Sequence, residues 1–289
     1  MTNTPVNIND LNIKKLGNSL EISVFPVKFK NYKVKKIKNK EYIIGKGMQL
    51  KDEDLINAFE GKNPMNNFKL LLSLINLVKK SLPDKNKNEW DPDKIKKAIP
   101  LKNIKEWINK YGLPYIGKID FAKTNHTRKK INNMLTFGVN INDFRSKIAG
   151  LYSFYKLWFA IKTKDKKIIN KFKANYSIPG KNIEETLTYY IDNSFDNNFK
   201  IKPAFDKDDK TFKLQIYTHN NQLNAALFQL YNLMTLDDIS TDENGNSQFQ
   251  HLKECNYCKN IFWAKDSKGK YCSPRCRKNA WYHKNKNTK

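Results

Sequence analysis

The 289-residue sequence lacks several features whose absence excludes whole classes of protein. No apolar run approaches the roughly 18 residues of a membrane-spanning helix, so we expect no membrane partner. Residues 1–7 have neither the basic nor the apolar region of a signal peptide. These two absences predict a cytoplasmic protein, in which thiols stay reduced.

Common catalytic and nucleotide-binding motifs are also missing. The chain has no Walker A loop, no strand-borne G-x-G-x-x-G, no G-x-S-x-G and no H-E-x-x-H. The four histidines are scattered, and neither His251 nor His283 has an acid or a nucleophile placed beside it to form a catalytic pair. We therefore expect a protein that is not an enzyme.

Acidic residues and arginines are both scarce. The chain has 28 acids against 54 lysines and arginines, a formal net charge of +26, which favours an anionic partner such as nucleic acid. Lysine is abundant everywhere, as an AT-rich coding sequence produces without selection for binding. The placement of the four arginines is therefore more informative, and two of them, Arg275 and Arg277, flank Cys276.

Cysteine is rare, but its placement is specific. The only four cysteines form two close pairs, Cys255 with Cys258 and Cys272 with Cys276, separated by 13 residues. Zn²⁺ prefers four such ligands in a tetrahedron. The spacing predicts one structural Zn²⁺ ion, and a shell closed by four thiolates leaves no position for a catalytic water. Two disulfides, a redox C-x-x-C and a chance arrangement are the alternatives, and a redox motif leaves the second pair unexplained.

The residues between and after the pairs predict a small metal-binding fold. The first pair reads as a tight knuckle, residues 261–263 as a strand, and residues 270–271 as the start of its return strand. Ser273 and Pro274 suit a helix N-cap and first turn, which places Cys276 near the positive end of the helix dipole. This order of knuckle, hairpin and helix predicts a treble-clef-like zinc finger.

The motif from Cys255 to Asn279 resembles the CGNR-type zinc finger of bacterial proteins with an ABATE-like N-terminal domain. The resemblance rests on both cysteine pairs, Phe262 and the run from Lys270 to Asn279, and in outline it covers residues 199–284. It implies a DNA-binding transcriptional regulator. The chain departs from the family at its name motif, where Cys276-Arg-Lys-Asn stands in place of Cys-Gly-Asn-Arg.

Hydrophobic periodicity predicts an α+β body that is mostly helical, with a β-rich N-terminus and one later hairpin. Helices are expected at 65–81, 101–111, 143–163, from 182 and at 221–234, and the hairpin at 199–217. A short helix is also expected at 52–59, and an exposed loop at 84–93. The predicted domains are a body at 1–235, an acidic polar linker at 236–249 and the zinc finger at 250–289.

These features predict a zinc-containing nucleic-acid-binding protein, with DNA as the favoured partner. The expected contacts lie on the last helix, at Arg275, Arg277, Lys278 and Lys284. Trp281 and Tyr282 either pack that helix against the knuckle or stack near the nucleic acid. The alternatives are a structural or protein-interaction zinc module without nucleic-acid contact, and an RNA-binding protein that uses the basic N-terminal strands.

Overall fold

The structure is a computed structural model, and its description covers most of the chain. The described residues are 20–24, 28–37, 39–49, 56–57, 68–83, 89–115, 117–118, 137–194, 199–206, 211–218, 222–239, 251–266 and 268–286. Within these ranges we find no helix that combines the length and the apolar composition needed to cross a membrane.

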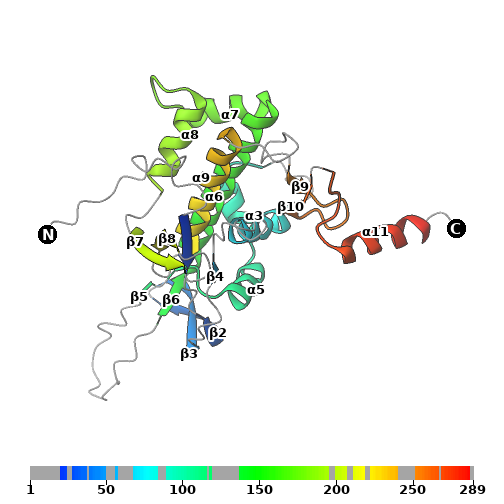
Figure 1. Ribbon diagram of the computed structural model, residues 1–289. Coiled ribbons are helices and arrows are strands. Elements are labelled where there is room, and N and C mark those ends of the chain that lie inside the picture. The colour runs from blue at the N-terminus through cyan, green and yellow to red at the C-terminus, as the bar shows by residue number, and fades with distance from the viewer. Residues whose placement is uncertain are drawn as a thin grey trace, which may run out of the picture.

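A long helix, α6 (Ile141–Thr163), runs through the centre of the body (Figure 1). Asn140 begins it by accepting a hydrogen bond from the Asp143 backbone N–H at 2.9 Å, as an N-cap does. Its apolar stripe, which includes Phe144, Ile148 and Trp158, is buried. The helix predicted at 143–163 is therefore confirmed.

Within the described residues, six further helices of the body surround α6 or pack near it. The sequence predictions at 101–111 and from 182 are confirmed, because α5 ends before Gly112 at φ 85° and α8 begins with an Asn182–Glu185 capping box. The helices are α3 (Lys69–Ser81), α4 (Pro92–Ala98), α5 (Leu101–Tyr111), α7 (Lys166–Tyr176), α8 (Ile183–Asp192) and α9 (Gln222–Ile239).

The described part of the body also contains two four-stranded sheets. The first has the order β4-β1-β8-β7, in which β1 lies parallel to β8 and β7 and β8 form the hairpin predicted at 199–217. The second is antiparallel throughout, with the order β2-β3-β6-β5. The strands are β1 (Leu20–Val24), β2 (Lys28–Ile37), β3 (Lys40–Gln49), β4 (Ile56–Asn57), β5 (Gly117–Lys118), β6 (Phe137–Asn140), β7 (Phe199–Asp206) and β8 (Thr211–Thr218).

Two sequence predictions for the body were wrong. Residues 56–57 form strand β4 inside the segment predicted as a helix at 52–59. The segment 84–93 was predicted as an exposed loop, yet Trp90 is buried and Asp91 caps α4 by accepting from the Asp93 N–H. The Asp-Pro pair at 91–92 is the local signal that indicates this helix start.

Helix α9 lies between the first sheet and helices α3 and α6, so it is covered on nearly every side. Two of its buried polar side chains form hydrogen bonds to other segments of the body. Gln229 accepts a hydrogen bond from the Leu71 N–H at 2.7 Å, which satisfies a donor in the first turn of α3. Gln222 donates to the carbonyls of Tyr111 and Leu113.

Helix α9 continues to Ile239, so the first residues of the predicted linker at 236–249 are helical. Residues 240–249 lie outside the described part.

We predict that Gln229→Met destabilises the protein by about 1–3 kcal/mol, because the Leu71 N–H would remain buried without its acceptor. Urea unfolding measures this loss. As the control, Lys102→Met on the exposed face of α5 should change the unfolding free energy by less than about 0.5 kcal/mol. Equal effects of the two variants would show that the Gln229 connection contributes nothing to the fold.

Candidate metal centre

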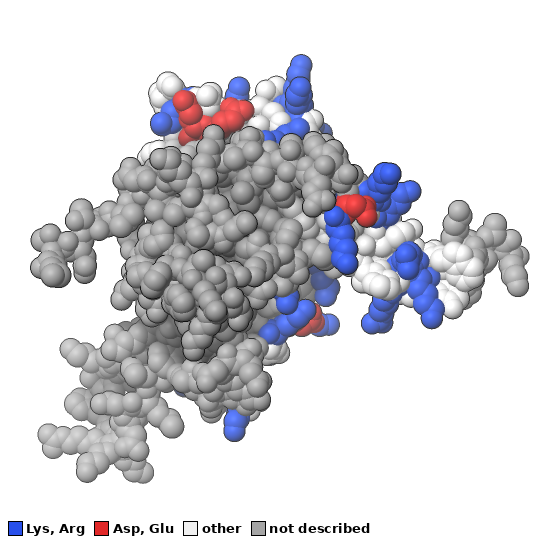
Figure 2. Space-filling view, viewed as in Figure 1, with Lys and Arg blue, Asp and Glu red and all other residues white. Residues whose placement is uncertain are grey.

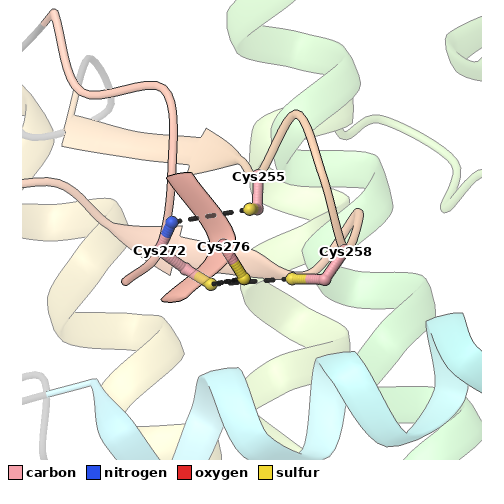
Figure 3. A group of neighbouring side chains, drawn as sticks. All are labelled: Cys255, Cys258, Cys272 and Cys276. Atoms are coloured by element: carbon pink, nitrogen blue, oxygen red, sulfur yellow. Dashed lines mark hydrogen bonds between the residues drawn. The ribbon is translucent and has the colours of Figure 1, made fainter. Parts of the chain in front are cut away.

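Four sulfur atoms converge near the C-terminus (Figure 3). The Sγ atoms of Cys255, Cys258, Cys272 and Cys276 all lie within 4.8 Å of one another. Cys272 Sγ is 3.5 Å from Cys258 Sγ and 3.4 Å from Cys276 Sγ. All four residues are free cysteines, and these separations far exceed the ~2.05 Å of a disulfide. The predicted ligand set is therefore brought together, and the disulfide alternative is not what the structure contains.

The first cysteine pair forms a knuckle between two short strands, β9 (Leu252–Glu254) and β10 (Ile261–Trp263). The Cys255 carbonyl accepts from the Lys259 N–H at 2.9 Å, and the Cys255 N–H donates to Asn260 O at 2.8 Å. Lys259 adopts a left-handed backbone with φ 62°, which lets the chain reverse within five residues. This turn places Cys258 opposite the second pair.

The predicted pairing of strand 261–263 was wrong. We expected residues 270–271 to form the return strand, but β10 instead pairs antiparallel with β9, which precedes the knuckle. The segment after Gly269 returns to the knuckle without forming a strand. Lys270 O accepts from the Asn256 N–H at 3.0 Å, and the Cys272 N–H donates to Cys255 Sγ at 3.5 Å. The knuckle therefore sits at the tip of a β9–β10 ribbon.

The second cysteine pair lies at the start of α11 (Pro274–Lys286). Ser273 caps this helix as predicted, because its Oγ accepts from the Cys276 N–H at 3.2 Å and its carbonyl accepts from the Arg277 N–H at 3.1 Å. Cys276 is in the first turn, where the helix dipole favours a thiolate. A knuckle, a ribbon and a helix are therefore all present, and the treble-clef classification stays a prediction.

The thiols differ in their acidity. Burial alone would raise the pKa of the Cys255 thiol, but the backbone N–H groups of Cys258, Cys272 and Tyr257 outweigh it and lower that pKa to about 6. Burial and the neighbouring sulfurs raise the pKa of Cys272. Thiols this close oppose one another's ionisation, because like charges repel. A divalent cation would remove this conflict, since it binds thiolates.

The donor set fits Zn²⁺. Four thiolates at ~2.3 Å from a tetrahedral ion lie about 3.8 Å apart, close to the separations of 3.4 and 3.5 Å between neighbouring sulfurs. The N–H donors to Cys255 Sγ are the contacts that orient a thiolate ligand and offset its charge. The four cysteines could therefore hold one metal ion, in a shell without room for a reactive water.

The ribbon that carries the knuckle packs on helix α3 of the body. Asn76 donates from Nδ2 to Ile261 O at 2.8 Å and accepts at Oδ1 from the Ile261 N–H at 2.7 Å. One side chain thus satisfies both backbone groups of Ile261, as a neighbouring strand would. Trp263 stacks on Phe68 with ring centroids 4.9 Å apart, and Lys79 pairs with Glu254. The sequence did not predict these contacts, because no local sequence pattern indicates which distant residues pack together.

His251 has a structural part in this contact. It is buried, its ring is nearly parallel to Trp263 at a centroid distance of 5.6 Å, and its Nδ1 donates to the Ala264 carbonyl at 3.1 Å. His283 is exposed on α11, where its Nε2 lies 3.3 Å from Tyr257 Oη. Each histidine therefore contributes to holding the ribbon or the helix in place.

The predicted nucleic-acid contacts lie on α11, which projects away from the body (Figure 1). Arg275, Arg277 and Lys278 are exposed. Lys284 is on the same helix, and its side chain lies outside the described part. Trp281 is 59% and Tyr282 53% exposed, so the interpretation that they pack α11 against the knuckle was wrong. The described contact between the knuckle and the later turns of α11 is instead made by Tyr257 with His283.

We predict about one zinc ion per chain in the purified protein, and well below one in the Cys258→Ser variant, because a neutral hydroxyl is a poor zinc ligand. Metal analysis after exhaustive dialysis gives the ratio. Tyr257→Phe is the matched control at the adjacent position and should keep the full metal content. Equal zinc contents in the Cys258→Ser and wild-type proteins would exclude this site.

We also predict that Asn76→Ala speeds the transfer of zinc to a competing chelator several-fold, because the ribbon loses both hydrogen bonds to α3. A buried backbone group that loses its hydrogen-bond partner lowers the stability by about 1–3 kcal/mol. Asn103→Ala removes a hydrogen bond to Ser81 on the body and touches no part of the ribbon, so it serves as the control. If both variants release zinc at the wild-type rate, the contact with α3 does not stabilise the metal centre.

No family model matches this chain, and no match was found among the curated proteins or the solved structures. The resemblance to the CGNR-type zinc finger and its ABATE-like partner domain therefore stays a hypothesis, which rests on the motif at residues 255–279 and on the outline of residues 199–284.

Proposed function

We propose that this chain is a zinc-containing protein that binds nucleic acid through α11 and carries out no catalysis. The observation that carries the proposal is the composition and exposure of this helix. From Pro274 to Lys286 it contains two arginines, three lysines and no acid, and the side chains of Arg275, Arg277 and Lys278 are exposed. Arginine forms bidentate hydrogen bonds to phosphate and to guanine edges, so such a helix suits a nucleic acid.

The surroundings of α11 support the same proposal. Residues 253–289 contain eleven lysines and arginines against two acids, Glu254 and Asp266. Glu254 is paired with Lys79, which leaves little negative charge near the helix. Figure 2 shows basic side chains on the module that carries α11. A positive surface of this kind attracts phosphates before any specific contact forms.

The metal centre would give this helix a fixed direction. A 13-residue helix is marginally stable by itself in water, and α11 is joined to the described part of the body through the cysteine cluster and the ribbon. With Zn²⁺ bound to Cys272 and Cys276, the first turn of α11 would be tied to the knuckle and thereby to α3. The cations would then be presented in one arrangement, which lowers the entropy lost on binding.

The finer prediction of a DNA-binding transcriptional regulator rests on the family resemblance, and we keep it as a proposal within this broader function. A second candidate is a zinc module that only clamps the C-terminal segment to the body. The hydrogen bonds from Asn76 to Ile261 favour a clamp. A clamp alone, however, gives no role to the exposed cations of α11.

The test is a binding experiment with a charge-matched control. We expect Arg275→Ala/Arg277→Ala/Lys278→Ala to weaken nucleic-acid binding and to reduce the slope of log affinity against log salt concentration by about 2–3, since each phosphate contact contributes about 0.7–0.9. Fluorescence anisotropy with labelled oligonucleotides at several salt concentrations measures both quantities.

The control is Lys167→Ala/Lys171→Ala/Lys173→Ala, which removes the same charge from the exposed side of α7. We expect it to change the salt slope by less than one. An equal loss in both variants would mean that diffuse lysine charge, and not α11, attracts the nucleic acid. Unchanged binding in the α11 variant would leave the clamp as the function of the finger.

A further inference from the structure

The aromatic pair on α11, Trp281 and Tyr282, is more exposed than the other aromatic residues whose burial the structure describes. All five tryptophans lie in described segments, and four of them are buried, with at most 8% of the side chain exposed. Trp281 is the exception at 59%, and its neighbour Tyr282 is 53% exposed. Two adjacent large rings in solvent cost hydration free energy unless a partner covers them.

The two rings form an ordered surface on the helix. Their centroids are 5.2 Å apart and their planes meet at 72°. Lys278 Nζ lies 5.7 Å from the centre of the Tyr282 ring, one helical turn earlier. Arg277 and Lys278 precede Trp281 and Tyr282 by four positions, so each cation lies on the same side of the helix as a ring. Two cations therefore lie one helical turn before two aromatic rings on the same side of α11.

This combination selects the chemistry of the partner. An apolar protein surface would cover the rings but would bury the arginines and lysines without counter-charges, which is costly. A second copy of this basic helix would bring like charges together. A partner that offers both planar apolar faces and regularly spaced negative charges avoids both costs. Nucleic acid with accessible bases has these properties.

We propose that Trp281 and Tyr282 form a stacking platform for unpaired bases, so that the preferred ligand of α11 is single-stranded nucleic acid. This inference rests on the proposed function and makes it more specific. Arg277 and Lys278 bind the phosphates of the strand, while its bases stack on the rings about one helical turn, or 5.4 Å, further along.

Duplex nucleic acid suits this platform less well. The faces of paired bases are covered by their neighbours in the stack, and a side chain reaches them only by opening a base step. The free energy needed to open a base step is about as large as the free energy gained from one stacking contact. A single strand exposes its base faces at little cost, and rings at 72° to one another can each receive a different base because the strand is flexible.

The test uses the full-length, zinc-loaded protein and three probes, namely dT12, U12 and a 12-base-pair DNA duplex. Because Trp281 is the one exposed tryptophan, stacking should quench the red edge of the tryptophan emission with dT12 or U12 and leave it nearly unchanged with the duplex. Whichever of dT12 and U12 binds more tightly identifies DNA or RNA as the preferred single strand.

The variant Trp281→Ala/Tyr282→Ala should weaken single-strand binding by about 10-fold or more, consistent with the loss of one or two stacked bases. Duplex binding should change by less than threefold, and the zinc content should stay at the wild-type value. Tyr189→Ala removes a similarly exposed ring, 47% exposed on α8, and should leave all three affinities unchanged.

Two results would overturn this inference while preserving nucleic-acid binding. One is a double variant that binds dT12 and U12 as tightly as the wild type does. The other is an equal loss of single-strand and duplex binding, which would indicate a structural role for the rings. Failure of the wild-type protein to bind any of the three probes would refute the proposed function itself. A wild-type dimer that becomes monomeric in the double variant would assign the rings to self-association and would also refute the inference.

Discussion

The convergence of four cysteine sulfurs on one point is the constraint on which the C-terminal part of this protein depends. The sulfurs come from a knuckle, from Cys272 just before α11 and from Cys276 in the first turn of that helix. A module of this size buries too little surface to be stable by itself. The cation that the thiols are arranged to bind would therefore supply much of the free energy that holds α11 to the knuckle.

The metal centre faces the body on one side and solvent on the other. On the inner side, the β9–β10 ribbon is joined to α3 by Asn76, and Trp263 lies against Phe68 within the common hydrophobic core. On the outer side, α11 carries cations and rings that face solvent. A single site thus connects the packed interior to an exposed helix. A metal ion bound at this site would therefore link the orientation of the helix to the packing of the ribbon.

Local signals predicted the elements whose stability is local. Helix α5 begins and ends where its apolar spacing and Gly112 indicate, and α8 begins at its capping residue Asn182. The predictions failed where distant contacts decide the structure. Trp90 is buried because Phe172 and Tyr176 of α7 lie against it, and β10 pairs with β9 because the knuckle, not the later turn, brings two strands side by side.

The sequence alone determined the candidate metal ligands, because the spacing of two cysteine pairs is a local property. It also determined the cationic character of α11, which contains no acid. Only the tertiary structure decided what the finger rests on and which of its side chains remain in solvent. The contact of Asn76 with Ile261 joins residues 185 positions apart, and no periodicity in either segment encodes it. The exposure of Trp281 likewise depends on how α11 is oriented relative to the body. Burial depends on the packing of the whole chain, so the local sequence does not determine it.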